Sequence, residues 1–285
     1  MTTVEELSSP HKPTWCSGCG NFGILIALKG ALAKLSIPPE ETVVVSGVGC
    51  GSKIPHFIRT YGFESLHGRS VPPATGIHLA NNKLKVIAIG GDGDGYGIGL
   101  GHFIHAMRRN LNFTYIVQDN EIYGLTTGQT SPTTKKGTKT KSTPNGSIDT
   151  EVNPILLSLS AGATFVARGF AGDIPHLTDL IAQGITHHGI SHIDVFQPCV
   201  TWRKDLPYSL YQQKVYKLQE EGHDSSDLDA AMKKARETER WPIGVFYKCE
   251  QKPLYTDEIP FIKDAPLVKH DISNVDISKY VEEFL

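Results

Sequence analysis

The stretch Leu84–Gly99, LKVIAIGGDGDGYGIG, is the clearest indication of fold in this 285-residue sequence. Its first six residues form an apolar, β-branched run that is typical of a buried strand. Glycines follow at once, and Gly99–Arg109 then has the apolar spacing of a helix. Glycines at such a turn let the backbone approach a ligand, and the N-terminus of the following helix favours an anion. The stretch therefore predicts a strand, a phosphate-binding turn and a helix.

The same alternation of buried strands and helices continues along the chain. Continuous apolar runs predict the strands, which are Thr42–Val48, Leu84–Ile89, Phe113–Gln118, Ala163–Ala167 and His192–Phe196. Apolar periodicity predicts the helices, which are Phe22–Leu35, Pro73–Asn81, Gly99–Arg109, Pro154–Ala161 and Ile174–His188. Apolar strands separated by helices indicate an α/β fold with a doubly wound, mostly parallel sheet and helices on both faces. Such a sheet binds its ligands at the carboxyl ends of its strands.

Two stretches interrupt this pattern. Thr126–Ser147 is rich in Thr, Ser, Lys, Gly and Pro and lacks apolar periodicity, which favours an active-site cover or a partner-contacting loop over disorder. From Asp205 the chain combines a charged helical pattern at Leu228–Glu239 with a strand-like run at Ile243–Tyr247, and it carries no motif that we can assign. We therefore expect one domain over residues 1–204 and a C-terminal arm over residues 205–285, which packs on the domain or on a partner subunit.

Composition and charge exclude several classes of protein. With 39% hydrophobic and 20% charged residues the chain is globular, and its net charge of -2 gives no electrostatic reason for a nucleic-acid or membrane partner. No apolar run approaches the roughly 20 residues of a membrane span, and the N-terminus resembles neither a signal nor a transit peptide. We therefore expect a cytoplasmic protein. Five irregularly spaced cysteines in that compartment indicate metal binding more than disulfides.

A carboxylate stands inside the glycine turn. Asp92 would repel a phosphate unless a divalent cation lay between the two groups. The next predicted strand ends in Gln118–Leu125, QDNEIYGL, where the Asn120 amide and the Ile122 carbonyl offer the hard oxygen ligands that Mg²⁺ prefers. A dinucleotide site would instead need Gly-x-Gly-x-x-Gly after the first strand and an acid about 20 residues further on. The remaining alternative is a glycine-rich turn with solvated aspartates.

Four of the five cysteines are predicted to meet near this turn. Cys16 and Cys19 form a C-x-x-C pair, and Cys50 and Cys199 each follow a predicted strand at its ligand-binding end. Four thiolates suit either an iron–sulfur cluster or zinc. One pair with two distant single cysteines favours the cluster, and zinc, a thioredoxin-like pair and unrelated thiols remain as alternatives. Cys249 is expected to be a bystander.

The arrangement Gly-Asp-Gly followed about 28 residues later by Asn resembles the thiamine pyrophosphate motif of a large enzyme superfamily. The resemblance implies that Asp92, Asn120 and the main-chain carbonyl of Ile122 bind Mg²⁺, which bridges the diphosphate. It also implies that further residues contact the cofactor, namely Cys50, His67, Gly91, Gly93, Asp94, Gly124, Leu125 and Thr126.

Over about residues 12–204 the chain resembles the beta subunits of 2-oxoacid:ferredoxin oxidoreductases. The resemblance rests on motifs in a fixed order, which are WCSGCGN at 15–21, Gly49-Cys50, Ile54-Pro55-His56, His67-Gly68-Arg69, Ala74-Thr75-Gly76, the Gly-Asp-Gly-Asp turn, Asn120–Thr126 and Gln197-Pro198-Cys199. It implies a 4Fe–4S cluster bound by Cys16, Cys19, Cys50 and Cys199. It also implies a reversible reaction in which a 2-oxoacid, coenzyme A and oxidised ferredoxin give an acyl-coenzyme A, CO₂ and reduced ferredoxin. The stretch Gly51–His56 favours 2-oxoglutarate, with pyruvate or a broad range of 2-oxoacids as the alternative.

The same resemblance implies a partner subunit. Thiamine is activated by a glutamate on a pyrimidine-binding domain, and the family carries that domain on a separate alpha subunit. The chain has room for only one such α/β domain, so we expect it to be inactive alone and to act in a heterotetramer of two alpha and two beta subunits.

Two basic side chains are candidates for direct roles. The resemblance places His67 near the thiamine, where it would polarise the substrate carbonyl or relay a proton. Lys53, three residues after Cys50, would pair with the distal carboxylate of the substrate or with coenzyme A phosphates. For both, an ordinary solvated residue is the alternative. Two other functions remain open, a non-redox thiamine-dependent decarboxylase with structural zinc and a non-catalytic electron-transfer protein.

Overall fold

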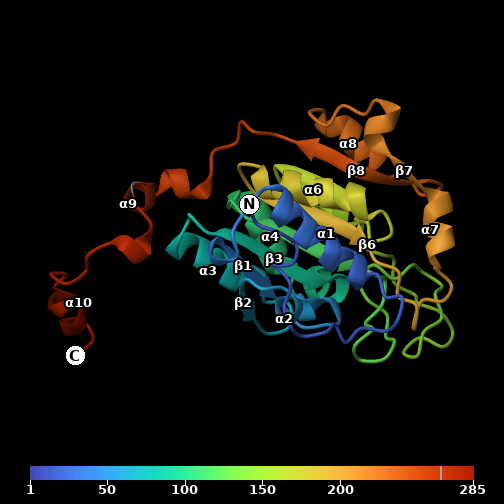
Figure 1. Cartoon of the computed structure of the whole chain (residues 1–285), viewed down its shortest axis with the longest axis horizontal. Helices are drawn as coiled ribbons and strands as arrows, with labels where there is room; N and C mark the ends of the chain where they lie inside the picture. Colours follow the sequence, from blue (N-terminus) through green and yellow to red (C-terminus); the bar gives the residue numbers. More distant parts are fainter. Residues whose placement is uncertain (264) are drawn as a thin grey trace.

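The computed structural model describes residues 1–263 and 265–285, and within them eight strands form one sheet in the order β2-β1-β3-β4-β6-β5-β8-β7 (Figure 1). The strands are β1 (Thr42–Ser46), β2 (Tyr61–Glu64), β3 (Lys85–Gly91), β4 (Thr114–Asp119), β5 (Phe165–Phe170), β6 (Ser191–Phe196), β7 (Val215–Lys217) and β8 (Trp241–Lys248). Neighbouring strands run parallel except β5 and β8, which are antiparallel. The prediction of a mostly parallel α/β sheet is therefore confirmed.

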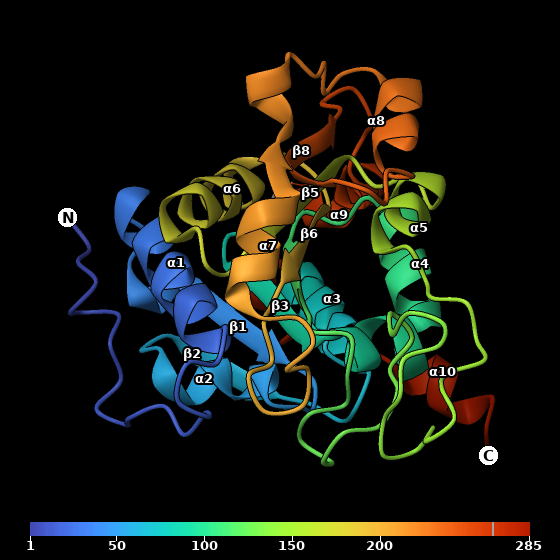
Figure 2. The same cartoon turned by 90° about the vertical axis from the view of Figure 1, so that its right-hand side faces the viewer.

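Helices cover both faces of the sheet (Figure 2). The helices are α1 (Asn21–Lys34), α2 (Ile54–Phe57), α3 (Val71–Ala80), α4 (Leu100–Arg109), α5 (Pro154–Ser160), α6 (Ile174–Thr186), α7 (Tyr208–Lys214), α8 (Leu228–Lys234), α9 (Pro260–Lys263) and α10 (Ser278–Glu282). Side chains alternate along each strand, so Val44 of β1 packs with α1 and α6 while Val43 and Val45 pack with α3 and α4. Two main cores result, one on each face, and a smaller third cluster contains Phe170, Leu206, Tyr211 and Ile243.

The predicted elements all form, with corrections at their ends. The strand predicted to reach Val48 ends at Ser46, because the Val48 amide donates to Asp94 Oδ1 (3.0 Å) and not to a neighbouring strand. The helix predicted to reach Glu239 ends at Lys234, and the Asn153 side chain donates to the Ala235 carbonyl (2.7 Å) just after it. Sequence analysis did not identify β2 and β7.

The segment after Asp205 divides into two parts. As far as Lys248 it packs on the sheet, because β8 lies between β5 and β7 and buries Ile243, Val245 and Phe246. Residues 267–285, which include α10, extend away from the sheet (Figure 1). The division at residue 204 into a domain and an arm stays a prediction.

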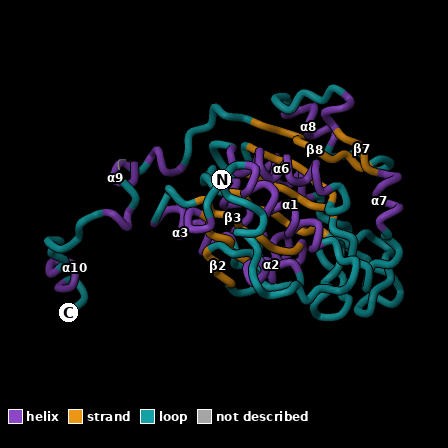
Figure 3. The backbone as a smooth tube through the Cα atoms, in the orientation of Figure 1, coloured by secondary structure: helices purple, strands orange, loops and turns teal. Residues whose placement is uncertain are grey.

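Loops gather at one end of the sheet (Figure 3). The segments that follow β1, β3, β4 and β6 meet there, at the carboxyl edge; they are residues 47–53, 92–99, 120–153 and 197–207, and Gly93–Ile98 forms a short π-helix. No helix in the described part of the chain is both long and apolar enough to cross a membrane.

Candidate active site

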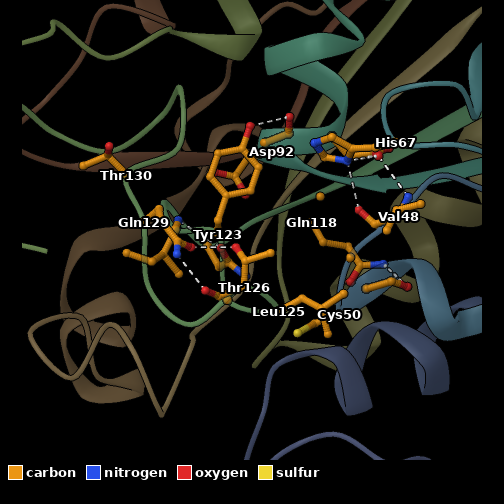
Figure 4. Close-up of a pocket in the computed structure, with 18 residues that line it drawn as sticks. Val48, Cys50, His67, Asp92, Gln118, Tyr123, Leu125, Thr126, Gln129 and Thr130 are labelled. Carbon is orange, nitrogen blue, oxygen red and sulfur yellow. Dashed lines mark hydrogen bonds and ion pairs between the residues drawn. The ribbon is translucent and has the colours of Figure 1, made fainter. Parts of the chain in front are cut away.

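A cavity of about 430 Å³ opens at this carboxyl edge, where the loops after β1, β3 and β4 meet (Figure 4). Glycines and polar side chains make up much of its lining. The lining residues are Val48, Gly49, Cys50, Gly51, His67, Gly91, Asp92, Gly93, Asp94, Gln118, Asn120, Ile122, Tyr123, Gly124, Leu125, Thr126, Gln129 and Thr130. We call this space the cofactor cavity.

Asp92 and Asn120 reach the cofactor cavity from the ends of two neighbouring strands. Asp92 is 2% exposed, and its Oδ2 accepts a hydrogen bond from Thr133 Oγ1 at 2.7 Å. Asn120 Oδ1 accepts from the Ile122 amide at 3.1 Å, which keeps the amide group and the Ile122 main chain on one turn. Burial raises the pKa of Asp92 to about 6, although hydrogen bonds from Ser131 and Thr133 oppose the shift.

The Asp94 side chain joins three loops under the cofactor cavity. Its Oδ1 accepts hydrogen bonds from the Val48 amide (3.0 Å), the Gly68 amide (2.7 Å) and His67 Nδ1 (2.9 Å). Burial raises the pKa of Asp94, while these donors favour its ionised form. The contact also orients His67, because Nδ1 faces Asp94 and Nε2 is the ring nitrogen left free of this contact.

Glycine is required in the turn for a steric reason at Gly93. A Cβ there would stand 2.2 Å from Tyr123 Cε1, and the Tyr123 hydroxyl donates to the Gly93 carbonyl at 3.0 Å. At Gly91 a Cβ would meet only the Gln118 carbonyl, at 3.9 Å. The backbone at Gly91 is therefore open to a ligand, and that at Gly93 is covered by Tyr123.

A second cavity of about 230 Å³ adjoins the first, and we call it the cysteine cavity. Its lining includes Cys16, Cys19, Cys50 and Cys199, which come from three separate loops. Burial raises the pKa of the Cys19 thiol to about 11, and the nearby thiols of the other three add to the shift. Cys249 lies outside this cavity and its amide donates to the Thr164 carbonyl at 2.8 Å.

Polar contacts hold the cysteine cavity in shape. Trp15 Nε1 donates to the Cys50 carbonyl at 2.6 Å, and Gln197 Nε2 donates to Cys19 Sγ at 3.1 Å. No three His, Cys, Asp or Glu side chains of the described residues come together in the way that the ligands of one metal ion do.

The two cavities share a wall. Cys50, Asn120, Gly124 and Leu125 line both of them. A Cβ on Gly124 would stand 3.8 Å from Cys50 Sγ and 3.9 Å from Cys199 Sγ. A group bound between these sulfurs would therefore lie beside a ligand of the cofactor cavity.

Comparison with known proteins assigns the chain to a family. A family model described as "Thiamine pyrophosphate enzyme, C-terminal TPP binding domain" matches residues 47–195, and one for the C-terminal part of the pyruvate ferredoxin oxidoreductase beta chain matches residues 199–264. The 2-oxoacid:ferredoxin oxidoreductase subunit beta of Saccharolobus solfataricus is 48% identical over 90% of each chain. The chain belongs to the 2-oxoacid:ferredoxin oxidoreductase beta subunits.

Other relatives agree with this assignment. The 2-oxoglutarate synthase subunit KorB of Archaeoglobus fulgidus is 38% identical, with 86% of this chain and 88% of the relative covered. A solved 2-oxoglutarate:ferredoxin oxidoreductase from Magnetococcus marinus, with 2-oxoglutarate, coenzyme A and succinyl-CoA bound, matches with a TM-score of 0.90 at 37% identity, over 99% of this chain and 96% of that chain. The beta-subunit designation implies an alpha-subunit partner. The match at 199–264 also covers much of the segment after Asp205, in which the sequence alone offered no motif that we could assign.

All of the predicted site residues of this beta subunit line one or both of the two cavities. All those predicted to contact thiamine pyrophosphate or Mg²⁺ line the cofactor cavity. Lys53 lines the cysteine cavity and not the cofactor cavity, with Nζ 3.5 Å from Thr14 Oγ1. Leu125 is exposed to 47% at the shared wall.

Sequence reasoning missed several residues that support the site in this beta subunit. Thr133 lies in the long polar loop, where no local pattern distinguishes it from its neighbours. Glu121 and Arg203 form a buried ion pair at 2.9 Å, and neither side chain stands out in the sequence. Gln118 and Gln197 had a detectable signal, since each is a polar residue at or just after the end of an apolar strand.

Proposed function

We propose that the chain binds thiamine pyrophosphate and Mg²⁺ in the cofactor cavity and a 4Fe–4S cluster in the cysteine cavity. With an alpha subunit it converts 2-oxoglutarate and coenzyme A to succinyl-coenzyme A and CO₂ and passes two electrons, one at a time, to ferredoxin. The observation that carries this proposal is the wall shared by the two cavities, since it puts a four-cysteine site next to a phosphate-binding turn.

The residues of the cofactor cavity fit a diphosphate held through a magnesium ion. The Asp92 carboxylate, the Asn120 amide oxygen and the Ile122 carbonyl are hard oxygen donors of the kind that Mg²⁺ prefers. The open backbone at Gly91 and the helical segment that begins at Gly93 suit the phosphate oxygens. A buried, uncompensated Asp92 carboxylate also has its pKa raised to about 6, and a bound cation would compensate its charge.

The cysteine cavity fits an iron–sulfur cluster better than a single zinc ion. Tetrahedral zinc requires four sulfurs about 2.3 Å from one point, whereas a cubane cluster takes each thiolate at a different iron. Within the described residues, the four cysteines line one cavity without forming the close group that one metal ion needs. Gly124 supports this assignment, because any side chain there would project toward Cys50 and Cys199.

Bound cofactors would supply the carbon nucleophile for decarboxylation and the acceptor for single electrons. The chain's own residues would orient the substrate and keep water away from it. Asp94 holds His67 by Nδ1, so the His67 Nε2 side is available to a substrate oxygen or a proton at the rim of the cofactor cavity. Lys53, beside the cysteine cavity, would attract the distal carboxylate of the substrate or a coenzyme A phosphate.

Names of the relatives support 2-oxoglutarate as the substrate. KorB proteins and the solved Magnetococcus marinus enzyme are named for 2-oxoglutarate. The more similar archaeal subunits are named only for 2-oxoacids, so a broad range that includes pyruvate is the second candidate.

An alpha subunit would complete the site. The rim of the cofactor cavity exposes Val48 (39%) and Leu125 (47%), which suits cover by a partner chain that brings the pyrimidine-binding domain. We propose an assembly of two alpha and two beta subunits.

Two experiments test the proposal. Serine binds iron poorly, so replacing any of the four proposed ligands with serine should lower the iron content of the purified complex. The four variants are Cys16→Ser, Cys19→Ser, Cys50→Ser and Cys199→Ser. The control Cys249→Ser should leave the iron content unchanged. The chain alone should not reduce a viologen dye with 2-oxoglutarate and coenzyme A, whereas the complex with its alpha subunit should. Iron loss in Cys249→Ser but not in Cys199→Ser would refute the ligand set, and full turnover by the chain alone would refute the two-subunit site.

A further inference from the structure

One buried arginine connects the turn of the cofactor cavity with the turn of the cysteine cavity. Arg203 Nη1 donates to Glu121 Oε2 (2.9 Å) and to the Glu121 carbonyl (3.1 Å). The amide of the same residue donates to the Cys199 carbonyl at 3.0 Å. Its guanidinium is fixed from the other side by Asp205, through Nε and Nη2. With a side chain only 3% exposed, Arg203 has little freedom to move.

The residue that Arg203 holds has an unusual backbone. Glu121 has φ +56°, the left-handed region that residues other than glycine rarely adopt. It stands between Asn120 and Ile122, so its conformation determines how the Asn120 amide and the Ile122 carbonyl face the cofactor cavity. Strained backbone persists only where the surroundings hold it. Here Arg203 and the Thr134 hydroxyl (2.7 Å) both donate to the Glu121 carbonyl.

Charge gives Arg203 a second role at the same turn. Glu121 brings a carboxylate that is only 11% exposed to the same turn as Asn120 and Ile122. Arg203 pairs directly with Glu121 and so offsets part of this negative charge beside the diphosphate site. Its planar fork makes several hydrogen bonds at once, which a lysine ammonium could not reproduce in the same geometry.

We propose that Arg203 is a positioning residue for both cofactors: its side chain holds the Asn120–Ile122 turn in the shape that binds Mg²⁺ and thiamine pyrophosphate, and the same side-chain bonds fix the place of residue 203, whose main-chain amide closes the Cys199 turn that binds the cluster. This inference rests on the proposed function, because it needs both cofactors to bind where we place them. Its distinctive consequence is that one substitution, remote from the reacting atoms, disturbs both sites together.

A buried ion pair elsewhere in the same domain provides a matched control. Arg168 Nε donates to Asp194 Oδ2 at 2.8 Å, with side chains 10% and 0% exposed. Neither residue lines the cofactor cavity or the cysteine cavity. Loss of either arginine leaves a carboxylate buried without its partner, so both substitutions are expected to destabilise the fold.

The experiment uses the purified complex with its alpha subunit, as wild type, Arg203→Met, Arg203→Lys, Glu121→Gln and Arg168→Met. The melting temperature reports the stability of the fold. Calorimetry of the thiamine-depleted complex with thiamine pyrophosphate and excess Mg²⁺ reports binding in the cofactor cavity. The electron paramagnetic resonance spectrum and the potential of the reduced cluster report the state of the cysteine cavity. Arg203→Met should lose at least about tenfold in thiamine pyrophosphate affinity and shift the cluster spectrum. Arg203→Lys should recover part of both, and Glu121→Gln should weaken binding less, since the bond to the Glu121 carbonyl remains.

Arg168→Met should lower the melting temperature as Arg203→Met does and leave both cofactor readouts at wild-type values. Wild-type cofactor affinity and cluster spectrum in Arg203→Met would overturn the inference. If Arg203→Met does not fold, Arg203→Lys and Glu121→Gln decide, because wild-type affinity in both would also overturn it. A wild-type complex that contains no iron or does not bind thiamine pyrophosphate would instead refute the proposed function.

Discussion

Replacing Gly124 with alanine would test the cluster site with a single methyl group. Gly124 lies in the wall between the two cavities, and its φ is outside the left-handed region, so alanine can adopt the same backbone. The new Cβ would stand 3.7 Å from Trp202 Cδ1, 3.8 Å from Cys50 Sγ and 3.9 Å from Cys199 Sγ. These are ordinary van der Waals distances, and the methyl group would occupy the space between two proposed cluster ligands.

The expected effects on fold and cluster therefore have opposite signs. Alanine at a backbone that accepts it stabilises the folded chain by roughly 0.4–1 kcal/mol, because the unfolded chain loses conformational freedom. The proposed cluster would have to share the space beside Cys50 Sγ and Cys199 Sγ with the methyl group, and packed surroundings do not yield easily. We expect Gly124→Ala to keep or slightly gain stability before cluster insertion and to lose most of its iron.

The assay compares Gly124→Ala with Gly101→Ala, whose Cβ would meet nothing within 4 Å. Urea unfolding of the iron-free chain gives the stability of each variant, and iron analysis with absorbance at about 400 nm gives the cluster content. Gly101→Ala should keep its iron. Full iron content in Gly124→Ala would refute the placement of a cluster between Cys50 and Cys199.

Three further predictions concern Asp92 and its support. Asp92→Ala should abolish thiamine pyrophosphate binding by calorimetry while the iron content persists, and unchanged affinity would rule out Asp92 as a magnesium ligand. Thr133→Val removes a hydroxyl that lies 2.7 Å from both Asp92 Oδ2 and Asp119 Oδ1. A hydrogen bond to a carboxylate is worth about 1.5–3 kcal/mol, so the affinity should fall roughly tenfold or more, and Thr133→Ser should restore it. Because burial raises the pKa of Asp92 to about 6 and only the carboxylate binds the metal, Mg²⁺-dependent affinity should be level above pH 7 and fall as the pH drops through 6. The loss of affinity should begin at a higher pH in Thr133→Val than in the wild type. An identical pH profile in these two proteins would contradict the role of Asp92 as the titrating magnesium ligand.

Local patterns predicted the central strands of the sheet because each contains an apolar run and is buried along almost its whole length. The run at 113–118 is such a case, and β4 is buried at every residue from Thr114 to Asp119. The edge strands were missed for the opposite reason. All residues of β2 are exposed and β7 has only three residues, so neither shows the apolar run that marks a buried strand. A strand-like run at 243–247 was recognised, but its place between β5 and β7 was not, since strand partners depend on contacts between distant parts of the chain.

The chemistry of the candidate site was readable from residue types and spacing. Glycines with Asp92, an amide at Asn120 and a C-x-x-C pair each require little more than local geometry, and the parallel sheet then brings the ends of β1, β3, β4 and β6 to one edge. Only the tertiary structure decided which neighbouring side chains support these groups. Thr133 reaches Asp92 across 41 positions and Arg203 reaches Glu121 across 82, and no local signal marks either side chain. Their partners are selected by the path of the loops over the sheet edge, where burial makes each unpaired charge or hydroxyl costly and so fixes one arrangement.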